Sequence, residues 1–260
     1  MRTLLLDADI LIYQVSAVHE TAIEWHKDFW TLHGDARLAK ISLDDTVDQI
    51  MDELNADNVV MALSATDRSS NWRLEILPTY KYNRDGRKPL VYKALVQHVL
   101  DNYVTLERPT LEGDDVLGIL STMGAKPFEM VTGIKPGERV LVSLDKDLKT
   151  IPGLYQRRRG EDIREISEDE ANWHHLFQAL TGDTTDGYKG CPGIGPKTAK
   201  RILPPIGASV PELWEAVVAA YRKKNLGEEA ALVQAQVARI CRVSDYNFKQ
   251  KRVIPWTPDN

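Results

Sequence analysis

Nine carboxylates that fall into five short clusters constrain the fold of this chain more than any other feature. Three clusters follow a short apolar run typical of a buried strand, in LLLDADIL, VVMALSATD and RVLVSLDKDL. The other two, LEGDDVLG and LTGDTTDGY, adjoin stretches with helical spacing of apolar residues. The nine are Asp7, Asp67, Glu112, Asp114, Asp115, Asp145, Asp147, Asp183 and Asp186, with Asp9 as a weaker addition.

Carboxylates gathered at one site repel one another, raise their own pKa values and oppose folding unless cations lie between them. Hard divalent ions with oxygen ligands are the obvious neutralising group. Each cluster alone would equally fit a solvated strand end, a helix cap or a surface turn. The joint pattern therefore predicts metal-dependent phosphate chemistry, and no single cluster does.

The order of apolar runs predicts an α/β fold with a central, mainly parallel sheet flanked by helices on both faces. In such sheets the ligand crevice lies beyond the carboxyl ends of the strands, so Asp7, Asp67 and Asp145 should share one edge. Asp7 and Asp9, two residues apart, should point to one side of a strand end. The expected strands are 3–6, 58–63 and 139–143, the expected helices are 37–55, 89–103 and 114–123, and 22–33 is expected to be a β-hairpin.

The strands are expected to stop after about residue 170, and helices to follow at 173–180, 196–203, 211–223 and 228–243. We therefore expect an α/β core over residues 1–170 and a helical region over 171–260. The last residues, from Trp256, should be frayed.

The composition fits a folded protein with a real core, since 43% of the 260 residues are hydrophobic and 27% are charged. No apolar run is long enough to span a membrane, and Asp7 and Asp9 interrupt the N-terminal apolar stretch. Cys191 and Cys241 stand far apart, which predicts neither a zinc site nor a disulfide, as in a cytoplasmic protein. The net charge is −5, but without the nine clustered acids 29 acids face 33 Lys and Arg, so the rest of the chain is mildly basic.

The segment GCPGIGPKTAKRIL suggests a phosphate-binding turn, but it does not have P-loop spacing. Pro196 intervenes before Lys197, and no strand precedes the glycines. A helix–hairpin–helix fits better, because Gly193 and Gly195 permit a tight turn and Pro196 suits the first helical position. Free N–H groups there would bind a backbone phosphate, with Lys197 and Lys200 adding charge. A plain packing corner is the alternative.

The segment LPTYKYNRDGRKP interleaves basic and aromatic residues, a composition that suits a nucleic-acid strand. A solvated basic loop is the alternative. The residues concerned are Tyr80, Lys81, Tyr82, Arg84, Arg87 and Lys88.

The order of these motifs resembles the 5′-nuclease (flap endonuclease-like) superfamily from residue 3 to about 203. EGDDVLG, SLDKDLKTIP, WHHLFQALTGDTTDGY and QVARICRVSDYNF are most similar to the 5′-to-3′ exonucleases of short-tailed phages. The resemblance implies a PIN/Rossmann-like core and a C-terminal region with a helix–hairpin–helix (H3TH) motif at about 183–203. Two departures stand out: Gly187 and Tyr188 replace an Asn–hydrophobic pair, and the short segment after Arg84 predicts a short arch.

The resemblance also implies roles for residues. The nine acids would hold two Mg²⁺ ions, with Mn²⁺ as a substitute, and a monovalent cation could sit at the hairpin. Lys81 and Arg84 would be the catalytic basic pair, and Tyr80 would stack on a base. The DNA-binding residues would be Tyr80, Gly193, Gly195, Lys197 and Lys200.

The expected function is a 5′-to-3′ exonuclease that hydrolyses phosphodiesters of double-stranded DNA by two-metal-ion catalysis, in phage DNA degradation, replication or recombination. The alternatives are a structure-specific flap endonuclease, cleavage of RNA in hybrids, and a non-catalytic protein that binds DNA ends. The expected partner is duplex DNA with a 5′ end or branched DNA, bound by a monomer in the host cytoplasm without membrane contact.

Overall fold

A six-stranded sheet forms the centre of the protein in a computed structural model that describes residues 1–83, 86–157 and 160–259. The strand order is β5-β4-β1-β6-β7-β8, and all pairings are parallel except that of β7 with β8. The predicted mainly parallel sheet is therefore confirmed. Its strands are β1 (Arg2–Asp7), β4 (Asn58–Leu63), β5 (Val104–Glu107), β6 (Glu138–Val142), β7 (Gly153–Gln156) and β8 (Arg164–Ile166).

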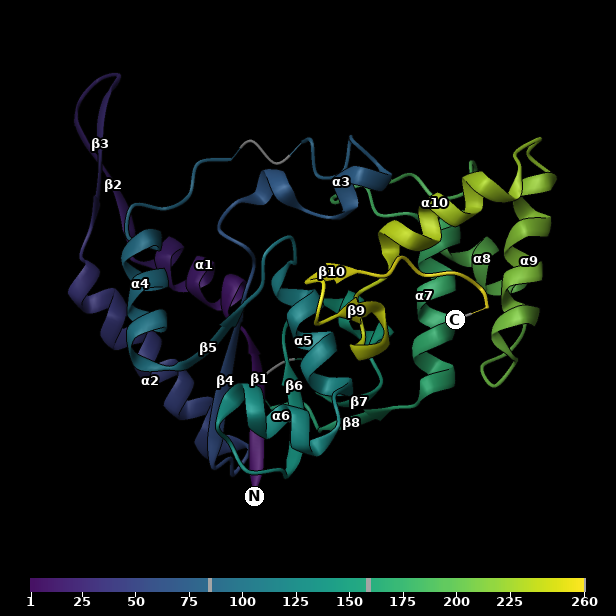
Figure 1. Cartoon of the computed structure of the whole chain (residues 1–260). Coiled ribbons are helices and arrows are strands. Elements are labelled where there is room, and N and C mark those ends of the chain that lie inside the picture. Colours follow the sequence, from purple (N-terminus) through teal and green to yellow (C-terminus); the bar gives the residue numbers. More distant parts are fainter. Residues whose placement is uncertain (84–85, 158–159, 260) are drawn as a thin grey trace.

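Helices cover both faces of this sheet (Figure 1). Successive residues of a strand point to opposite faces. Leu4 and Leu6 accordingly pack with the helices of one face, and Leu5 packs with those of the other. The first face carries α1 (Ala8–Val18), α2 (Ala36–Glu53) and α4 (Tyr92–Asn102), and the second carries α5 (Gly113–Thr122) and α6 (Ala125–Thr132).

Four helices form a second hydrophobic cluster beside the sheet (Figure 1). Leu176, Leu180, Trp214 and Tyr221 are among its buried residues. The short helix α3 (Arg73–Ile76) contacts this region through α10. The four are α7 (Glu168–Thr181), α8 (Pro196–Ile202), α9 (Val210–Arg222) and α10 (Glu228–Ala238).

The C-terminal segment corrects three sequence expectations. Strands do not stop at residue 170, because β9 (Tyr246–Asn247) and β10 (Arg252–Val253) pair as an antiparallel hairpin. The chain does not fray from Trp256, whose ring is 4% exposed and packs against His175 and Trp214. The helix expected to reach residue 243 ends at Ala238, because the chain returns to the sheet there and packs against α5.

The hairpin expected at 22–33 is confirmed as β2 (Glu20–His26) and β3 (Phe29–Gly34), and it projects from the end of α1 (Figure 1). The expectation that Asp7 and Asp9 share one side of a strand end is wrong. Helix α1 begins at Ala8, so Asp7 caps the helix and Asp9 lies in its first turn. In the described part of the chain, no helix has both the length and the apolar character needed to cross a membrane.

Candidate active site

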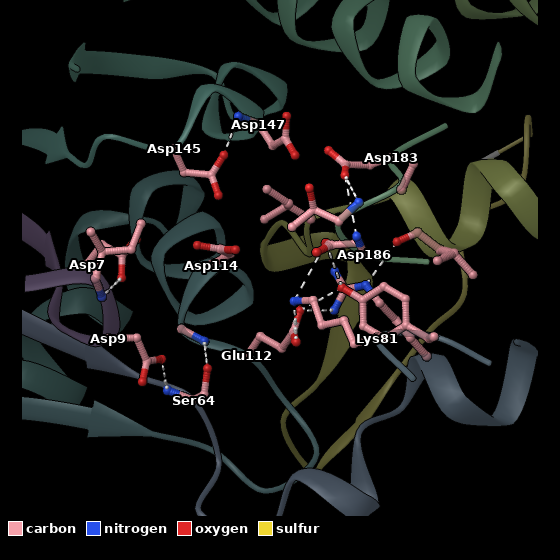
Figure 2. A pocket seen from close by; sticks show the side chains of 18 of the residues that line it. Asp7, Asp9, Ser64, Lys81, Glu112, Asp114, Asp145, Asp147, Asp183 and Asp186 are labelled. Atoms are coloured by element: carbon pink, nitrogen blue, oxygen red, sulfur yellow. Dashed lines mark hydrogen bonds and ion pairs between the residues drawn. The ribbon is translucent and has the colours of Figure 1, made fainter. Parts of the chain in front are cut away.

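A cavity of about 660 Å³ contains most of the predicted acids and lies beyond the carboxyl ends of β1 and β6. Figure 2 shows carboxylates from several elements pointing into it from different sides. Five basic side chains also line it: Arg68, Arg73, Lys81, Lys88 and Lys146. The acids that line it are Asp7, Asp9, Glu112, Asp114, Asp145, Asp147, Asp183 and Asp186.

Two strand ends place their acids in the same way. Asp7 ends β1 and caps α1, where its Oδ1 accepts a hydrogen bond from the Ile10 N–H at 3.1 Å. Its Oδ2 accepts one from the Ser143 hydroxyl at 2.8 Å. Asp145 follows β6 and caps the 3₁₀ helix η2 (Lys146–Thr150) by accepting from the Asp147 N–H at 2.8 Å. Strand-to-helix turns thus fix both carboxylates at the sheet edge.

Three acids of the cavity have raised pKa values, because burial and acidic neighbours outweigh the cations around them. Burial, with Asp9 and Asp145 nearby, raises the pKa of Asp7 to about 7. Burial and the charge of Asp145 likewise raise the pKa of Asp147 to about 7. Burial, followed by the charges of Asp7 and Asp145, raises the pKa of Asp114 well above its ordinary value. This is the arrangement expected of carboxylates that are built to share cations.

Glu112, in contrast, is held in its ionised form. Its Oε1 accepts from Lys81 Nζ at 2.6 Å, and its Oε2 lies 2.9 Å from the Tyr80 hydroxyl and 3.4 Å from Arg73 Nη1. Burial opposes ionisation, but Lys81 and Arg73 outweigh it and hold the pKa of Glu112 below its usual value. Glu112 is therefore a charged member of the cavity wall.

Asp115 does not line the cavity. It is 0% exposed, and its two oxygens accept from both terminal nitrogens of Arg73 at 2.8 Å each. It also accepts from the Trp72 indole at 3.1 Å and the Cys241 N–H at 3.0 Å. These donors tie Asp115 to three segments of the fold and leave its carboxylate no free side for a metal ion. Nothing in its surroundings supports the predicted metal-binding role.

Asp67 also lies apart from the other acids. It is exposed and caps the 3₁₀ helix η1 (Arg68–Ser70), accepting from the Ser69 N–H at 3.0 Å and the Ser69 hydroxyl at 2.6 Å. It lines a smaller cavity of about 180 Å³, which Lys81 and Glu112 also line. The structure thus brings seven of the nine predicted acids to the main cavity and leaves out Asp67 and Asp115.

A closed loop, and not a helical turn, brings Asp183 and Asp186 to the cavity. The Asp183 N–H donates to the Tyr188 carbonyl at 2.9 Å, and the Tyr188 N–H donates to the Asp183 carbonyl at 3.1 Å. Asp183 Oδ1 accepts from the Thr185 N–H at 2.7 Å. Gly187 has φ +78°, and a Cβ there would lie 3.1 Å from the Thr79 carbonyl oxygen. Glycine therefore lets this loop approach the 79–81 segment.

Lys81 is positioned by that loop. Its N–H donates to the Asp186 carbonyl at 2.8 Å, and its Nζ lies 2.6 Å from Glu112 Oε1 and 3.6 Å from Asp186 Oδ2. The Tyr80 ring is 5% exposed and lies 4.9 Å from Lys81 Nζ, so little of it is open for stacking on a base. Arg84, the predicted partner of Lys81, lies outside the described residues.

The remaining basic residues of this segment are occupied differently. Arg87 pairs with Glu20 through contacts of 2.8 and 2.5 Å, which ties the segment to the start of β2. Lys88 Nζ lies 4.8 Å from the Tyr92 ring and 5.3 Å from the Tyr13 ring, and Lys88 lines the main cavity.

The glycine-rich turn joins α7 to α8. Gly193 has φ +72°, Gly195 caps α8, and Pro196 lies in the first turn as predicted. Gly193, Gly195, Lys197 and Lys200 are all exposed. The predicted hairpin geometry is present, and its role on DNA stays a prediction.

Sequence reasoning missed several residues of the cavity wall. Lys146 lies 3.6 Å from Asp183 Oδ2, and Arg73 reaches both Glu112 and Asp115. Arg73 follows the predicted acid Asp67 by six residues, in a D-x-x-x-x-x-R pattern that the family resemblance also includes, so a signal for it was present in the sequence. Gln178 and Tyr188 also line the cavity, and burial together with nearby acids raises the pKa of Tyr188 well above its usual value. Of these two residues, only Tyr188 stood out in the sequence, as a departure from the family pattern.

The acids surround the cavity without closing on one point. Within residues 1–83, 86–157 and 160–259, no group of three or more His, Cys, Asp and Glu side chains is arranged to hold a metal ion as it stands. Mutual repulsion of carboxylates without a cation accounts for such spacing.

Comparison with known proteins places this geometry in a family. No family model matches the chain. The exodeoxyribonuclease of Enterobacteria phage T3 is 30% identical over 98% of this chain and 92% of that protein. The exonuclease of Escherichia phage T7 is 30% identical over 98% and 93%. The flap endonuclease Xni of Vibrio campbellii is 29% identical over 76% of each chain.

Among solved structures, the 5′-exonuclease of bacteriophage T5 with bound zinc ions shares the fold, with a TM-score of 0.60 over 92% of this chain and 89% of that chain, at 18% identity. The sequence similarity to the T3 and T7 proteins extends over nearly the whole of each chain. The chain therefore belongs to the 5′-nuclease (flap endonuclease-like) superfamily.

Proposed function

We propose that the protein is a 5′-to-3′ exodeoxyribonuclease that hydrolyses phosphodiester bonds of double-stranded DNA. The observation that carries the proposal is the convergence of seven predicted acids and Lys81 on one cavity at the sheet edge. Two phage relatives that match nearly the whole chain bear the names exodeoxyribonuclease and exonuclease, which supports this activity. A relative from Streptomyces coelicolor, which matches 63% of the chain, is named 5′-3′ exonuclease, which supports the polarity.

The donor set fits divalent metal ions. Carboxylate oxygens are the ligands that Mg²⁺ prefers, and it commonly binds through a few carboxylates together with phosphate. The raised pKa values of Asp7 and Asp147, each about 7, show that positive charge is lacking where such ions would sit. We propose Mg²⁺ as the natural ion, with Mn²⁺ able to replace it. When bound, such ions would polarise the phosphodiester and lower the pKa of the attacking water.

The acids divide into two groups by their mutual influence. Besides burial, Asp7 and Asp145 raise the pKa of Asp114, and Asp145 also raises that of Asp7. The pKa of Asp147 is likewise raised by Asp145 and then by Asp183 and Asp186. Figure 2 shows Asp7, Asp114 and Asp145 on one side of the cavity and the other three acids on the opposite side, with Asp145 beside Asp147. We propose that each group holds one of two ions. Asp67 and Asp115 are the weakest candidates for either ion.

Lys81 would supply positive charge to the scissile phosphate. Its Nζ already lies between Glu112 and Asp186, so it is held in the cavity before substrate binds. A preorganised cation costs little reorganisation when negative charge develops on the phosphate. Arg84 would assist, as the family resemblance implies.

The exposed turn at Gly193 and Gly195 would bind the backbone of the duplex. Lys197 and Lys200 would add charge without reading sequence. A monovalent cation at this turn belongs to the same proposal. We keep the division into a nuclease core, 1–170, and a helical DNA-binding region, 171–260, with one addition: the segment 239–253 returns to pack on the core.

Flap cleavage is the second candidate, because the flap endonuclease Xni of Vibrio campbellii matches 76% of the chain. Action on RNA in hybrids, a monomeric state and the host cytoplasm remain part of the proposal.

Digestion of a duplex with a labelled 5′ end, with and without Mg²⁺, tests the function. Release of labelled mono- and dinucleotides only with the ion is expected. A labelled flap released whole from a branched substrate would favour the endonuclease. Binding without cleavage at any ion concentration would contradict both activities and favour a DNA-end-binding protein.

A further inference from the structure

Among the described residues, two neutral polar groups of the cavity wall have no hydrogen-bond partner, the Gln178 Oε1 and the Tyr188 hydroxyl. Gln178 on α7 lines the cavity, and its buried Oε1 accepts no hydrogen bond. Tyr188 also lines the cavity and is 4% exposed. No hydrogen bond of its hydroxyl is found within residues 1–83, 86–157 and 160–259.

The position of Tyr188 follows from the loop that carries two of the acids. Asp183 and Tyr188 face each other across a two-bond antiparallel bridge. Side chains directly opposite in such a pair stand on the same face. The ring of Tyr188 is therefore directed to the side of the Asp183 carboxylate, and it packs in a small cluster with Tyr80, Val237 and Ala238.

The neighbouring tyrosine provides a contrast. The Tyr80 hydroxyl lies 2.9 Å from Glu112 Oε2 and 3.1 Å from Asp186 Oδ2, so its hydrogen-bonding capacity is used within the protein. The Tyr188 hydroxyl has no such acceptor, although Asp147, Asp183 and Asp186 influence it electrostatically. The Tyr188 hydroxyl is accessible from the cavity, so a ligand there can reach it, whereas the Gln178 Oε1 is buried without a partner. Buried polar groups are almost always hydrogen-bonded, so the second group needs a partner too.

The chemistry of the two groups limits what that ligand is. A hydroxyl and a carboxamide both donate and accept hydrogen bonds and carry no charge. The Tyr188 hydroxyl can therefore donate to a phosphate oxygen, and Gln178 can donate through its Nε2 once the amide is turned so that Nε2 takes the place of Oε1. Neither group competes with metal ions for the acids, as an added Lys or Arg would. Building on the proposed nuclease function, we infer that Tyr188 and Gln178 contact a phosphate of the DNA strand on the Asp147–Asp183 side of the cavity.

Tyr188→Phe tests this inference because it removes one oxygen and keeps the ring in its cluster. We expect cleavage of duplex DNA with Mg²⁺ to slow by about ten- to a hundredfold, the range for a lost hydrogen bond to a charged group. Thermal stability should not change, because the hydroxyl has no partner in the protein. Gln178→Leu, which keeps the approximate volume, should slow the reaction in the same direction.

Tyr246→Phe is the matched control. The Tyr246 hydroxyl is unpartnered as well, but it is buried, and the residue lines a separate apolar cavity with Phe248. Its removal should leave cleavage at the wild-type rate. Equal slowing of the Tyr246 and Tyr188 variants would overturn the inference.

A second readout separates contact with phosphate from a structural effect. Sulfur in place of one non-bridging oxygen of the scissile or adjacent phosphate accepts hydrogen bonds poorly. In the wild type, one diastereomer at one of these phosphates should slow cleavage, and in Tyr188→Phe the same sulfur should add little further loss. The inference would be overturned if the sulfur slowed Tyr188→Phe as much as the wild type at every phosphate tested. It would also be overturned if Tyr188→Phe cleaved at the wild-type rate. Absence of Mg²⁺-dependent cleavage by the wild type would instead refute the proposed function.

Discussion

Asp114 and Asp115 are neighbours in the sequence, in the same turn of α5, and yet they are in opposite electrostatic states. Asp114 lines the cavity, and burial with the nearby acids raises its pKa well above the ordinary value. Asp115 is 0% exposed, but the Arg73 guanidinium outweighs burial and lowers its pKa. Successive helical residues point roughly 100° apart, so one step along α5 exchanges acidic neighbours for a cation.

The difference separates two uses of a carboxylate. Asp115 does structural work, since its Oδ2 also accepts from the Glu112 N–H at 3.2 Å and so completes the start of α5. Asp114 makes no such bond with α5 or its neighbours in the described residues, and the cavity is its only environment. The unpaired acid should therefore matter for activity, and the paired acid for stability.

Asp114→Ala should have the largest effect on activity. Loss of a carboxylate that holds a metal ion removes several kcal/mol of transition-state stabilisation, so cleavage with Mg²⁺ should fall by about a thousandfold or more. DNA binding should change little, because the hairpin contacts are untouched. Single-turnover cleavage and fluorescence anisotropy with a labelled duplex measure the two quantities. A rate near that of the wild type would refute the metal-binding role of Asp114.

Asp115→Asn should have the largest effect on stability. The change removes the nearer counter-charge of the buried Arg73 and leaves the longer contact with Glu112, which should lower the free energy of unfolding by about 3 kcal/mol. Asp114→Asn is the matched control, since it makes the same chemical change one residue away and removes a repelled charge. Urea unfolding without metal should show a loss for the first variant and none for the second. Equal losses would mean that the two acids have the same role.

Sequence patterns predicted the elements that carry the acids but not the partners of those acids. Short apolar runs before Asp7 and Asp145 sufficed to predict β1, β6 and the shared sheet edge. The pairing of Asp115 depends on Arg73, 42 residues earlier, and on the N–H of Cys241, 126 residues later. Local sequence spacing carries no information on such long-range contacts, so the sequence could not separate the cavity acids of LEGDDVLG from the structural one.

The missed elements have a similar cause. Strands β5, β7 and β8 have only three or four residues each, too few for a period to show. The return of the chain after Ala238 depends on burial against α5 and on the Arg73 guanidinium, which donates to the carbonyls of Val237 and Arg239. Expecting a frayed end from Trp256 ignored that an indole ring buries a large apolar area.

Lys81→Met should have an intermediate effect. Loss of one preorganised cation at the phosphate should slow cleavage by about a hundredfold. Glu112 would also lose its nearest cation, so its pKa should rise and the acid limb of the pH–rate profile should move to higher pH. Lys200→Met is the control, because this exposed lysine lies on α8 and its loss should leave the rate at saturating DNA unchanged. An unchanged acid limb in the Lys81 variant would show that the ionisation of Glu112 does not determine that limb.

The smallest expected effect is the pH dependence of stabilisation by Mg²⁺. The pKa of Asp7 and that of Asp147 rise from 3.8 to about 7 in the folded protein, so their ionisation costs stability. That cost is absent below pH 4, grows as pH rises, and is complete above about pH 7. Glu112 and Asp115, whose pKa values are lowered, stay ionised throughout the range above pH 5 and contribute no slope there.

Mg²⁺ would relieve the cost, so the rise in Tm on adding the ion should be small at pH 5.5 and larger at pH 8. Thermal unfolding with and without Mg²⁺ measures this, and Asp7→Asn should flatten the dependence because it removes one of the acids whose pKa is raised. A rise in Tm that is the same at every pH would show that the ion does not bind at the unpaired acids.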